Sequence, residues 1–356
     1  MASGALPDNP FVAAGMIEDP RLFVGRKDEL HAIASRMKGD QPTSINIVGD
    51  KHIGKSSLLH YFVLTWQQRG LDANRYVVIY LPLRGVDCQT ETGFYEAVAE
   101  GLLSYIPGWQ LQLRNPWRIK PLNRQAFSDA VKEWKQQGKL PVLCLDDFES
   151  LLKYPDKFHN GFYDNLRSLM DSNALMLVVA SCKQLDVYAN EHRFVSSFFN
   201  IGHTIYLKEL TTDEAIELSR LPTRSINGAA LSVDEQSHAQ QWGDRHPYKL
   251  QLAGSYLWEA RQQGKAIKWA KQQFKQQLTK AKSASNGQRW QLWLRWLVWD
   301  LPVRLGKIPQ FIGVTVGDIG NWITGLVMLL FPVLVLVGVV RWNEVWDFVR
   351  DKLGIK

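Results

Sequence analysis

The stretch from Gly49 to Ser56 limits the fold of this chain more than any other feature. It reads GDKHIGKS and matches the pattern G-x-x-x-x-G-K-[ST]. The glycines let the backbone curl so that its N–H groups converge on a phosphate, and a helix that begins near Lys55 adds the positive end of its dipole. An apolar, β-branched run from Thr43 to Val48 precedes the loop. The sequence therefore predicts a buried strand, a phosphate-binding loop and a helix in succession.

The residues of the loop have individual expected roles. Lys55 is expected to reach the β- and γ-phosphates of a nucleotide, and Ser56 to bind Mg²⁺ through its hydroxyl. ATP or ADP with Mg²⁺ is therefore the predicted ligand, and a glycine turn that carries an exposed lysine is the alternative. The residues of this region that we expect to bind the nucleotide are Gly49, Asp50, Lys51, His52, Ile53, Gly54, Lys55, Ser56 and Ser57.

Two acids follow a second apolar run. The segment from Val142 to Leu145 leads directly into Asp146 and Asp147. Asp146 is expected to hold Mg²⁺ through water beside the phosphate loop, and Asp147 to orient or deprotonate an attacking water as the catalytic base. Ser181 ends another apolar run. It is expected either to contact the γ-phosphate or the attacking water, or to be satisfied by neighbouring backbone.

Apolar runs that predict strands alternate with segments of helical periodicity up to about residue 210. This order predicts an α/β fold, a P-loop NTPase with a parallel sheet flanked by helices. From Thr211 onward only helices are expected: a small helical lid subdomain, a basic helix over about 258–282 and one C-terminal transmembrane helix. The predicted divisions are an N-terminal arm (1–22), the P-loop NTPase core (23–210), the helical lid (211–260), a basic Trp-rich juxtamembrane region (261–307), a connector (308–321), the transmembrane helix (322–340) and a tail (341–356).

Several segments share their order and spacing with a known class of ATPase. A resemblance to AAA-like ATP-binding proteins of the STAND class, relatives of AAA+ and archaeal-type ATPases, is carried by NPFVAAGMIEDPRLFVGRKDEL, SINIVGDKHIGKSSLL, VLCLDDFE, LMLVVASCKQL and RHPYKLQLAGSYLWEA. It covers about residues 9 to 260. The resemblance implies an arm motif that packs beside adenine, a sensor residue on the strand next to the acidic one, and a lid motif that contacts the nucleotide. The residues that carry these roles are Val24, Gly25, Arg26, Ser181, His246 and Pro247.

The resemblance also bears on the rate of hydrolysis. Many relatives have Glu at the position of Asp147, whose side chain is one methylene shorter, so we expect slow hydrolysis of ATP to ADP and phosphate. Arg193 and Arg245 are the candidates for an arginine finger, with solvated side chains as the alternative. A weak hydrolytic site suits a switch in which the nucleotide state sets conformation or assembly.

The C-terminal region is apolar enough to indicate a membrane span. The segment from Trp322 to Val340 contains no charged residue and would extend about 28 Å as a helix, close to the thickness of the hydrocarbon core. The alternatives are a buried core helix, or a re-entrant hairpin that also uses the residues just before the span. Asp318 and the short length favour a single span over the hairpin. Positive charge on the N-terminal flank predicts that the ATPase domain of this single-pass membrane protein is cytoplasmic.

Basic residues concentrate just before this segment. The stretch from Arg261 to Lys307 holds eleven Lys or Arg and one Asp, a net charge of +10, so a chain of net charge +7 leaves −3 elsewhere. An anionic lipid leaflet would attract the basic stretch by about 1 kcal/mol per residue, whereas the negative remainder argues against nucleic acid as a partner. Tryptophans alternate with Arg289, Arg295 and Arg304, which is typical of an interfacial helix. A helical core or self-association face is the alternative, and stacking on nucleic-acid bases is the least favoured reading.

Together these features predict a membrane-anchored, ATP-binding P-loop ATPase that acts as a signalling or defence switch. ATP binding would drive assembly into a homo-oligomer, and the trigger or protein partner is unknown. One alternative is a membrane-tethering adaptor whose nucleotide is structural and never hydrolysed. Another is a nucleic-acid-dependent AAA+ helper of transposition or replication.

Overall fold

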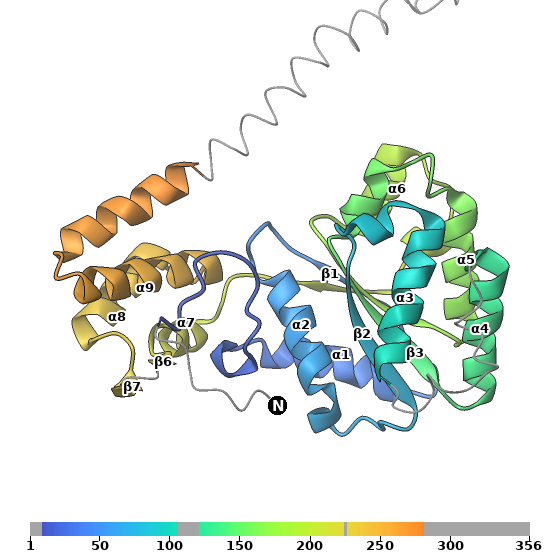
Figure 1. Ribbon diagram of the computed structural model, residues 1–356, viewed down its shortest axis with the longest axis horizontal. Coiled ribbons are helices and arrows are strands. Elements are labelled where there is room, and N and C mark those ends of the chain that lie inside the picture. The colour runs from blue at the N-terminus through green and yellow to red at the C-terminus, as the bar shows by residue number, and fades with distance from the viewer. Residues whose placement is uncertain (1–8, 106–120, 224–225, 281–356) are drawn as a thin grey trace, which may run out of the picture. The chain divides into compact units, whose positions relative to one another are not determined.

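The computed structural model describes residues 9–105, 121–223 and 226–280 of the chain (Figure 1). The chain forms two compact units, Met1–Phe274 and Lys275–Lys356, and the description below concerns the first. The predicted connector, transmembrane helix and tail lie outside the described residues, as does most of the predicted juxtamembrane region. Within the described ranges, no helix is both long and apolar enough to cross a bilayer.

A parallel sheet lies at the centre of the first unit, as the alternation of apolar runs predicts (Figure 1). Its strands are β1 (Ile45–Val48), β2 (Tyr76–Pro82), β3 (Leu140–Asp146), β4 (Met176–Ser181) and β5 (His203–Tyr206). They lie in the order β2-β3-β4-β1-β5. Every residue of β1, β3 and β4 is buried, because helices cover both faces of the sheet and leave no solvated face for polar side chains.

Two groups of helices cover the two faces of the sheet (Figure 1). These helices are α1 (Lys27–Lys38), α2 (Lys55–Thr65), α3 (Glu91–Tyr105), α4 (Arg124–Gln136), α5 (Asn160–Asp171) and α6 (Leu185–His192). On one face, α1 and α2 enclose a core that includes Met37 and Phe62. On the other, α3 to α6 enclose a core that includes Phe94, Trp134 and Phe162. Short 3₁₀ helices complete the unit at Pro20–Leu22, Trp66–Arg69, Val86–Gln89, Phe148–Lys153 and Ser197–Phe199.

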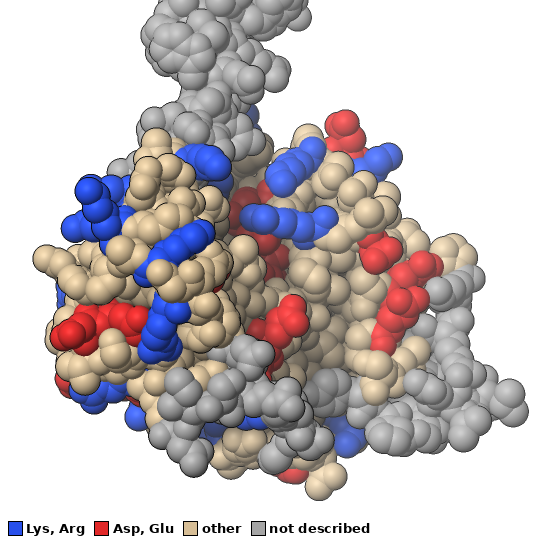
Figure 2. All heavy atoms as spheres, turned by 60° about the vertical axis from the view of Figure 1, so that its left-hand side comes forward, with Lys and Arg blue, Asp and Glu red and all other residues tan. Residues whose placement is uncertain are grey.

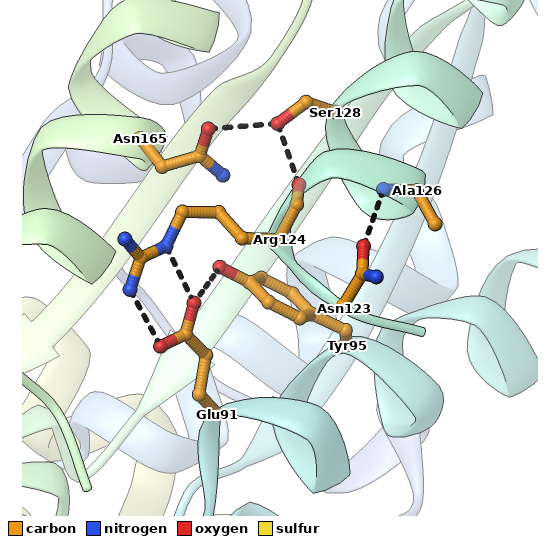
Figure 3. Close-up of polar contacts among 7 residues, drawn as sticks. All are labelled: Glu91, Tyr95, Asn123, Arg124, Ala126, Ser128 and Asn165. Carbon is orange, nitrogen blue, oxygen red and sulfur yellow. Dashed lines mark hydrogen bonds and ion pairs between the residues drawn. The ribbon is translucent and has the colours of Figure 1, made fainter. Parts of the chain in front are cut away.

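A polar cluster fixes α4 against α3 and α5 (Figure 3). Arg124 donates from Nε to Glu91 Oε1 (2.7 Å) and from Nη2 to Glu91 Oε2 (2.8 Å), while the Tyr95 hydroxyl donates to Glu91 Oε1 (2.8 Å). The Ser128 hydroxyl donates to Asn165 Oδ1 on α5 (2.7 Å). The two parallel bonds of the ion pair set the orientation of α4 as well as its distance from α3.

The strand order brings two important loops to one edge of the sheet. β4 lies between β1 and β3, and parallel strands all end at the same edge. The phosphate loop after β1 and the acids that end β3 therefore face each other across the end of β4. Crevices at the carboxyl ends of parallel strands are the usual place for ligand sites in open α/β sheets.

A helical lid follows the sheet. Its helices are α7 (Thr212–Ser219), α8 (Val233–Gly243) and α9 (Pro247–Gln262). Thr211 and Ser232 cap α7 and α8, each in a capping box with a Glu in the first turn.

The structure differs from two expectations for the region after Thr211. An antiparallel pair of strands, β6 (Pro222–Thr223) and β7 (Ile226–Ala229), interrupts the helices where no strand is expected. These strands are too short for an alternating apolar pattern to reveal them. The single helix expected over 258–282 is broken, because α9 ends at Gln262 and Gly264 takes a left-handed φ of 63° before a new helix begins. Glycine adopts this conformation without strain, so it ends helices readily.

An N-terminal arm ties the lid to the helix of the phosphate loop. The Val12 N–H donates to Gln251 Oε1 on α9 (2.9 Å). The Ile17 N–H donates to Ser57 Oγ on α2 (3.0 Å). The arm therefore connects the lid to the first turn of α2.

Candidate functional site

A cavity of about 470 Å³ lies between the sheet edge, the arm and the lid. Two kinds of residue line it. Polar and charged side chains, among them Lys55 and Asp146, come from the sheet edge, whereas apolar ones, among them Phe23, Leu210 and Leu218, come from the arm motif and the lid. Figure 2 shows acidic side chains in the shaded hollow between the two parts of the molecule and basic ones on both sides of it. A ligand with an apolar part and an anionic part would match such a lining.

The cavity brings together most of the residues that the sequence proposes for the site. Those that line it are Val24, Arg26, Lys51, His52, Ile53, Gly54, Lys55, Ser56, Ser57, Asp146, Asp147 and Pro247. They belong to four separate parts of the chain: the arm motif, the phosphate loop, the end of β3 and the start of α9. The proposed residues that do not line it are Gly25, Gly49, Asp50, Ser181 and His246.

The phosphate loop has the backbone shape that its glycines predict. Gly54 caps α2 with a left-handed φ of 100°, which only glycine adopts easily. A Cβ at Gly49 would lie 2.8 Å from Ile53 Cγ2 and 2.9 Å from the Leu207 carbonyl oxygen, so no larger residue fits there. In this arrangement the Lys55 ammonium donates to the Gly49 and Asp50 carbonyls, at 2.7 and 2.9 Å. The ammonium thus lies within the loop, at the place where a bound phosphate would need it.

The two acids after β3 lie in different surroundings. Asp146 is 3% exposed and accepts a hydrogen bond from the Tyr80 hydroxyl through Oδ2 (2.8 Å), while its Oδ1 has no hydrogen-bond partner. Asp147 is half-buried and takes a left-handed φ of 55°, which is unusual outside glycine. Its carboxylate forms an ion pair with Arg84, with 2.8 Å between Arg84 Nε and Oδ2. The Asp146 carboxylate is therefore buried and fixed. The Asp147 carboxylate is held by the Arg84 side chain, which is itself 67% exposed.

The donor atoms at this edge fit Mg²⁺. Asp146 Oδ1 is a buried carboxylate oxygen without a partner, and the Ser56 hydroxyl lines the same cavity. Among the described residues no group of three or more His, Cys, Asp or Glu could hold a metal ion. Mg²⁺ does not need such a cage, because it keeps several waters and uses one or two protein oxygens together with phosphate. When bound, the ion would neutralise phosphate charge between Ser56 and Asp146.

We predict that Arg84→Ala moves the acid limb of the pH–rate profile for ATP hydrolysis to higher pH. Burial, together with the charge of Asp146, raises the pKa of Asp147 above its usual value, and Arg84 opposes this rise. A base works only when deprotonated, so removing Arg84 makes hydrolysis fail sooner as the pH falls. The measurement is hydrolysis against pH for the wild type, Arg84→Ala and the control Arg167→Ala, whose guanidinium pairs with Asp171 on α5. A limb that stays in place or moves to lower pH would contradict the prediction.

The arm motif is locked between the phosphate loop and the lid. Arg26, 5% exposed, donates from Nη2 to the carbonyls of Ile53 (3.2 Å) and Lys208 (2.7 Å). Its backbone N–H donates to Glu214 Oε1 on α7 (2.6 Å). Gly25 takes a left-handed φ of 75°, which residues with a Cβ rarely adopt, and a Cβ there would also force the Glu214 side chain to shift. These contacts give Arg26 a positioning role beside the cavity rather than a free charge for phosphate.

The lid contacts the phosphate loop through aromatic rings. Tyr248 on α9 stacks on His52 with 4.8 Å between ring centroids. Burial and the neighbouring cations, Lys51 first, lower the pKa of His52, so a neutral imidazole faces the tyrosine near neutral pH. Pro247 lines the cavity at the start of α9, whereas His246 caps this helix and does not line it. Of the lid motif, the structure therefore brings Pro247 to the cavity.

Ser181 is fully buried and already satisfied. Its hydroxyl donates to the Lys183 carbonyl (2.7 Å) and accepts from Asn46 Nδ2 (2.8 Å). This is the second of the two arrangements that the sequence left open, a strand-end serine held by its neighbours. A contact between Ser181 and a γ-phosphate stays a prediction.

Neither candidate for an arginine finger lines the cavity. Arg193 ends α6 with a left-handed φ of 58°. Arg245 is half-exposed, with its Nη2 3.8 Å from a carboxylate oxygen of Glu209. Arg84, which the sequence does not single out, is the arginine that forms an ion pair with Asp147.

Several residues that the sequence does not mark also line the cavity, among them Val12, Tyr80, Arg84, Cys182, Tyr248 and Gln251. Cys182 lies beside the Lys55 ammonium, with 3.8 Å between Sγ and Nζ. Two of the missed residues could have been found, because Tyr248 follows Pro247 and Gln251 lies one helical turn beyond it, on the same face of α9.

Comparison with known proteins agrees with this geometry. The family model described as Novel STAND NTPase 1 matches residues 13–281. A Walker-type ATPase of Pyrococcus abyssi is 16% identical, with a TM-score of 0.57 over 85% of this chain and 88% of that one. The ORC2 protein of Aeropyrum pernix, solved in ADPNP–ADP complexes, is 14% identical, with a TM-score of 0.53 over 77% of this chain and 72% of that one. At these identities the likeness shows a shared fold. No curated protein matches the chain.

Proposed function

Because the chain belongs to the Novel STAND NTPase 1 family, we propose that it binds ATP with Mg²⁺ in the cavity between the sheet and the lid and hydrolyses it slowly. We further propose that it is a membrane-anchored switch that assembles on binding ATP.

One observation carries the proposal: a single cavity is lined both by phosphate-binding groups and by apolar residues of the lid and arm. Lys55, the loop N–H groups and the first turn of α2 suit a triphosphate. Phe23, Leu210 and Leu218 suit the flat apolar face of a base. A nucleotide bound across both sets would touch the sheet edge and the lid at once.

A nucleotide in this bridging position would couple the phosphate loop to the lid. A ligand shifts a conformational equilibrium only when it binds the two states differently. ATP would contact the loop through its phosphates and the lid through its base, and the His52–Tyr248 stack already joins these parts. ATP would therefore favour the arrangement in which the lid lies against the phosphate loop. Loss of the γ-phosphate would weaken this preference.

Asp147 is the proposed base of a slow hydrolytic reaction. It lies next to the Mg²⁺ position at Asp146, and its pKa is raised by burial, which makes the carboxylate a better proton acceptor. In this arrangement the Arg84 guanidinium holds the carboxylate. An attacking water would have to compete with that ion pair, in keeping with slow turnover.

The membrane anchor and the assembly are proposed from the sequence. The apolar segment 322–340 and the basic stretch before it suit a span beside an anionic leaflet on the cytoplasmic side. Assembly of the ATP-bound domains would gather these tails in one patch of membrane.

The full-length chain tests the proposal in two steps. Calorimetry with ATP plus Mg²⁺ and with ADP plus Mg²⁺ measures binding, and light scattering in detergent measures mass with ATP, ADP or no nucleotide. We expect both nucleotides to bind and the mass to rise with ATP alone. Flotation with phosphatidylserine vesicles and with neutral vesicles then tests the anchor, which predicts recovery with both and better recovery with the anionic ones.

The outcomes separate the rival functions. An absence of heat with either nucleotide would remove the basis of the proposal. Binding without phosphate release would favour a membrane-tethering adaptor with a structural nucleotide. Stimulation of hydrolysis by duplex or single-stranded DNA in the same assay would favour the nucleic-acid-dependent helper.

A further inference from the structure

The side chain of Gln251 stands out among the residues that line the cavity. It lies on α9, one turn after Pro247, and is 4% exposed. Its Oε1 accepts a hydrogen bond from the Val12 N–H (2.9 Å), but its Nε2 is buried and has no hydrogen-bond partner. A buried amide nitrogen without an acceptor is costly, because its lost bonds to water are not replaced.

The orientation of this carboxamide is fixed by its surroundings. The two ends of an amide are hard to tell apart by shape alone, and the assignment follows from the hydrogen bonds. The group that faces Gln251 from the arm is a backbone N–H, which can only donate. The carbonyl end must therefore point to Val12, and the NH₂ end is left to donate elsewhere.

Gln251 belongs to the lid side of the cavity. It lines the cavity from α9, one turn after Pro247, and the lid also contributes the apolar Leu218 of α7 to the same lining. A base that packs on the apolar residues of the lid would therefore come close to this carboxamide. Purine rings offer acceptors for its NH₂ group in unprotonated ring nitrogens.

We propose that Gln251 is a specificity-determining residue that donates a hydrogen bond from Nε2 to a ring nitrogen of the purine base. The inference rests on the proposed binding of ATP in this cavity. Gln251 then recognises the base with one end of its amide and holds the arm with the other. The same side chain would therefore couple binding of the base to docking of the arm on the lid.

The experiment combines two variants with atom-deleted nucleotides on the full-length protein. Affinities for ATP and for 1-deaza-, 3-deaza- and 7-deaza-ATP are measured for the wild type, Gln251→Met and Asn9→Ala. Asn9→Ala is the matched control, because Asn9 Nδ2 ties the same arm to Ser255 on α9 (3.0 Å) without lining the cavity. 2′-Deoxy-ATP tests whether the ribose is the acceptor instead.

We expect one deaza analogue to bind the wild type about 10-fold more weakly than ATP does. In Gln251→Met, ATP and that analogue should bind equally well, since the bond to the base is already absent, while the lost acceptor for the Val12 N–H changes both affinities by one common factor. Asn9→Ala should change the affinities for ATP and for all analogues by one common factor. Should Gln251→Met not fold, Gln251→Glu, which keeps an acceptor for Val12, is measured in the same way.

Other results would overturn the inference. An equal loss of ATP and of every deaza analogue in Gln251→Met would mean that the residue acts only through the arm. A loss confined to 2′-deoxy-ATP would move the contact to the ribose. Failure of the wild type to bind ATP at all would instead overturn the proposed function, and is recognised before any variant is tested.

Discussion

Replacement of Lys55 by alanine is expected to weaken ATP binding by about 100-fold or more, since it removes a charge-assisted hydrogen bond to phosphate inside a sheltered site. The lysine is 8% exposed, and within the described ranges its ammonium bonds to the Gly49 and Asp50 carbonyls and approaches the Cys182 sulfur. No acid of the described region forms an ion pair with it. Removal of Lys55 therefore leaves no buried acid without its partner. Without nucleotide, Lys55→Ala should be about as stable as the wild type.

The measurement is calorimetry with ATP and Mg²⁺, together with thermal unfolding with and without nucleotide. A bound ligand stabilises the folded state by about 2.7 kcal/mol at a concentration 100 times its Kd. The melting temperature of the wild type should rise with ATP, whereas that of Lys55→Ala should not. Lys132→Ala, an exposed change on α4, is the control and should behave as the wild type does. Survival of both the affinity and the ATP-dependent assembly in Lys55→Ala would contradict the proposed site.

The parts of the site that the sequence predicts well are those encoded in short stretches of chain. The backbone shape from Gly49 to Ser56 needs glycine at two positions, and this need is visible in the residues themselves. Asp146 is placed at the sheet edge by the strand that it ends. Because parallel strands share a carboxyl edge, the loop and the acids meet whatever the intervening residues are.

The parts that the sequence does not predict depend on contacts between distant segments. Tyr80 and Arg84 lie at and just beyond the end of β2, and they reach Asp146 and Asp147 only because β2 pairs with β3. No local pattern marks a tyrosine or an arginine for this task. The role of Arg26 is hidden for the same reason, since its partners are carbonyls of the phosphate loop and of the segment after β5.

Ser181 shows how a correct position can come with an uncertain role. The apolar run places it at the end of β4, between the phosphate loop and the acids, as expected. The side chain of Asn46 on the neighbouring strand, together with the Lys183 carbonyl, then decides where its hydroxyl is directed. Such pairing across strands depends on register, which only the folded sheet supplies.

Asp147→Asn is expected to lower ATP hydrolysis by about 10²- to 10⁴-fold, the usual contribution of a positioned general base. The affinity for ATP should stay within a few-fold, because Asp147 is the acid held by Arg84 and not the buried one beside the Mg²⁺ position. Asparagine keeps the shape of the side chain but cannot accept the proton of the attacking water. Phosphate release and binding are measured on the same preparation.

Asp146→Asn and Asp156→Asn give this prediction its contrast. Asp146→Asn removes the buried carboxylate with the unpartnered oxygen, so it should abolish the gain in affinity that Mg²⁺ brings as well as hydrolysis. Asp156 is exposed and does not line the cavity, so its change should alter neither quantity. Unchanged hydrolysis in Asp147→Asn would exclude it as the base. A wild type that releases no phosphate, with Asp147→Asn equally able to assemble on ATP, would instead mean that binding alone drives the switch, because the acid would then have no reaction to serve.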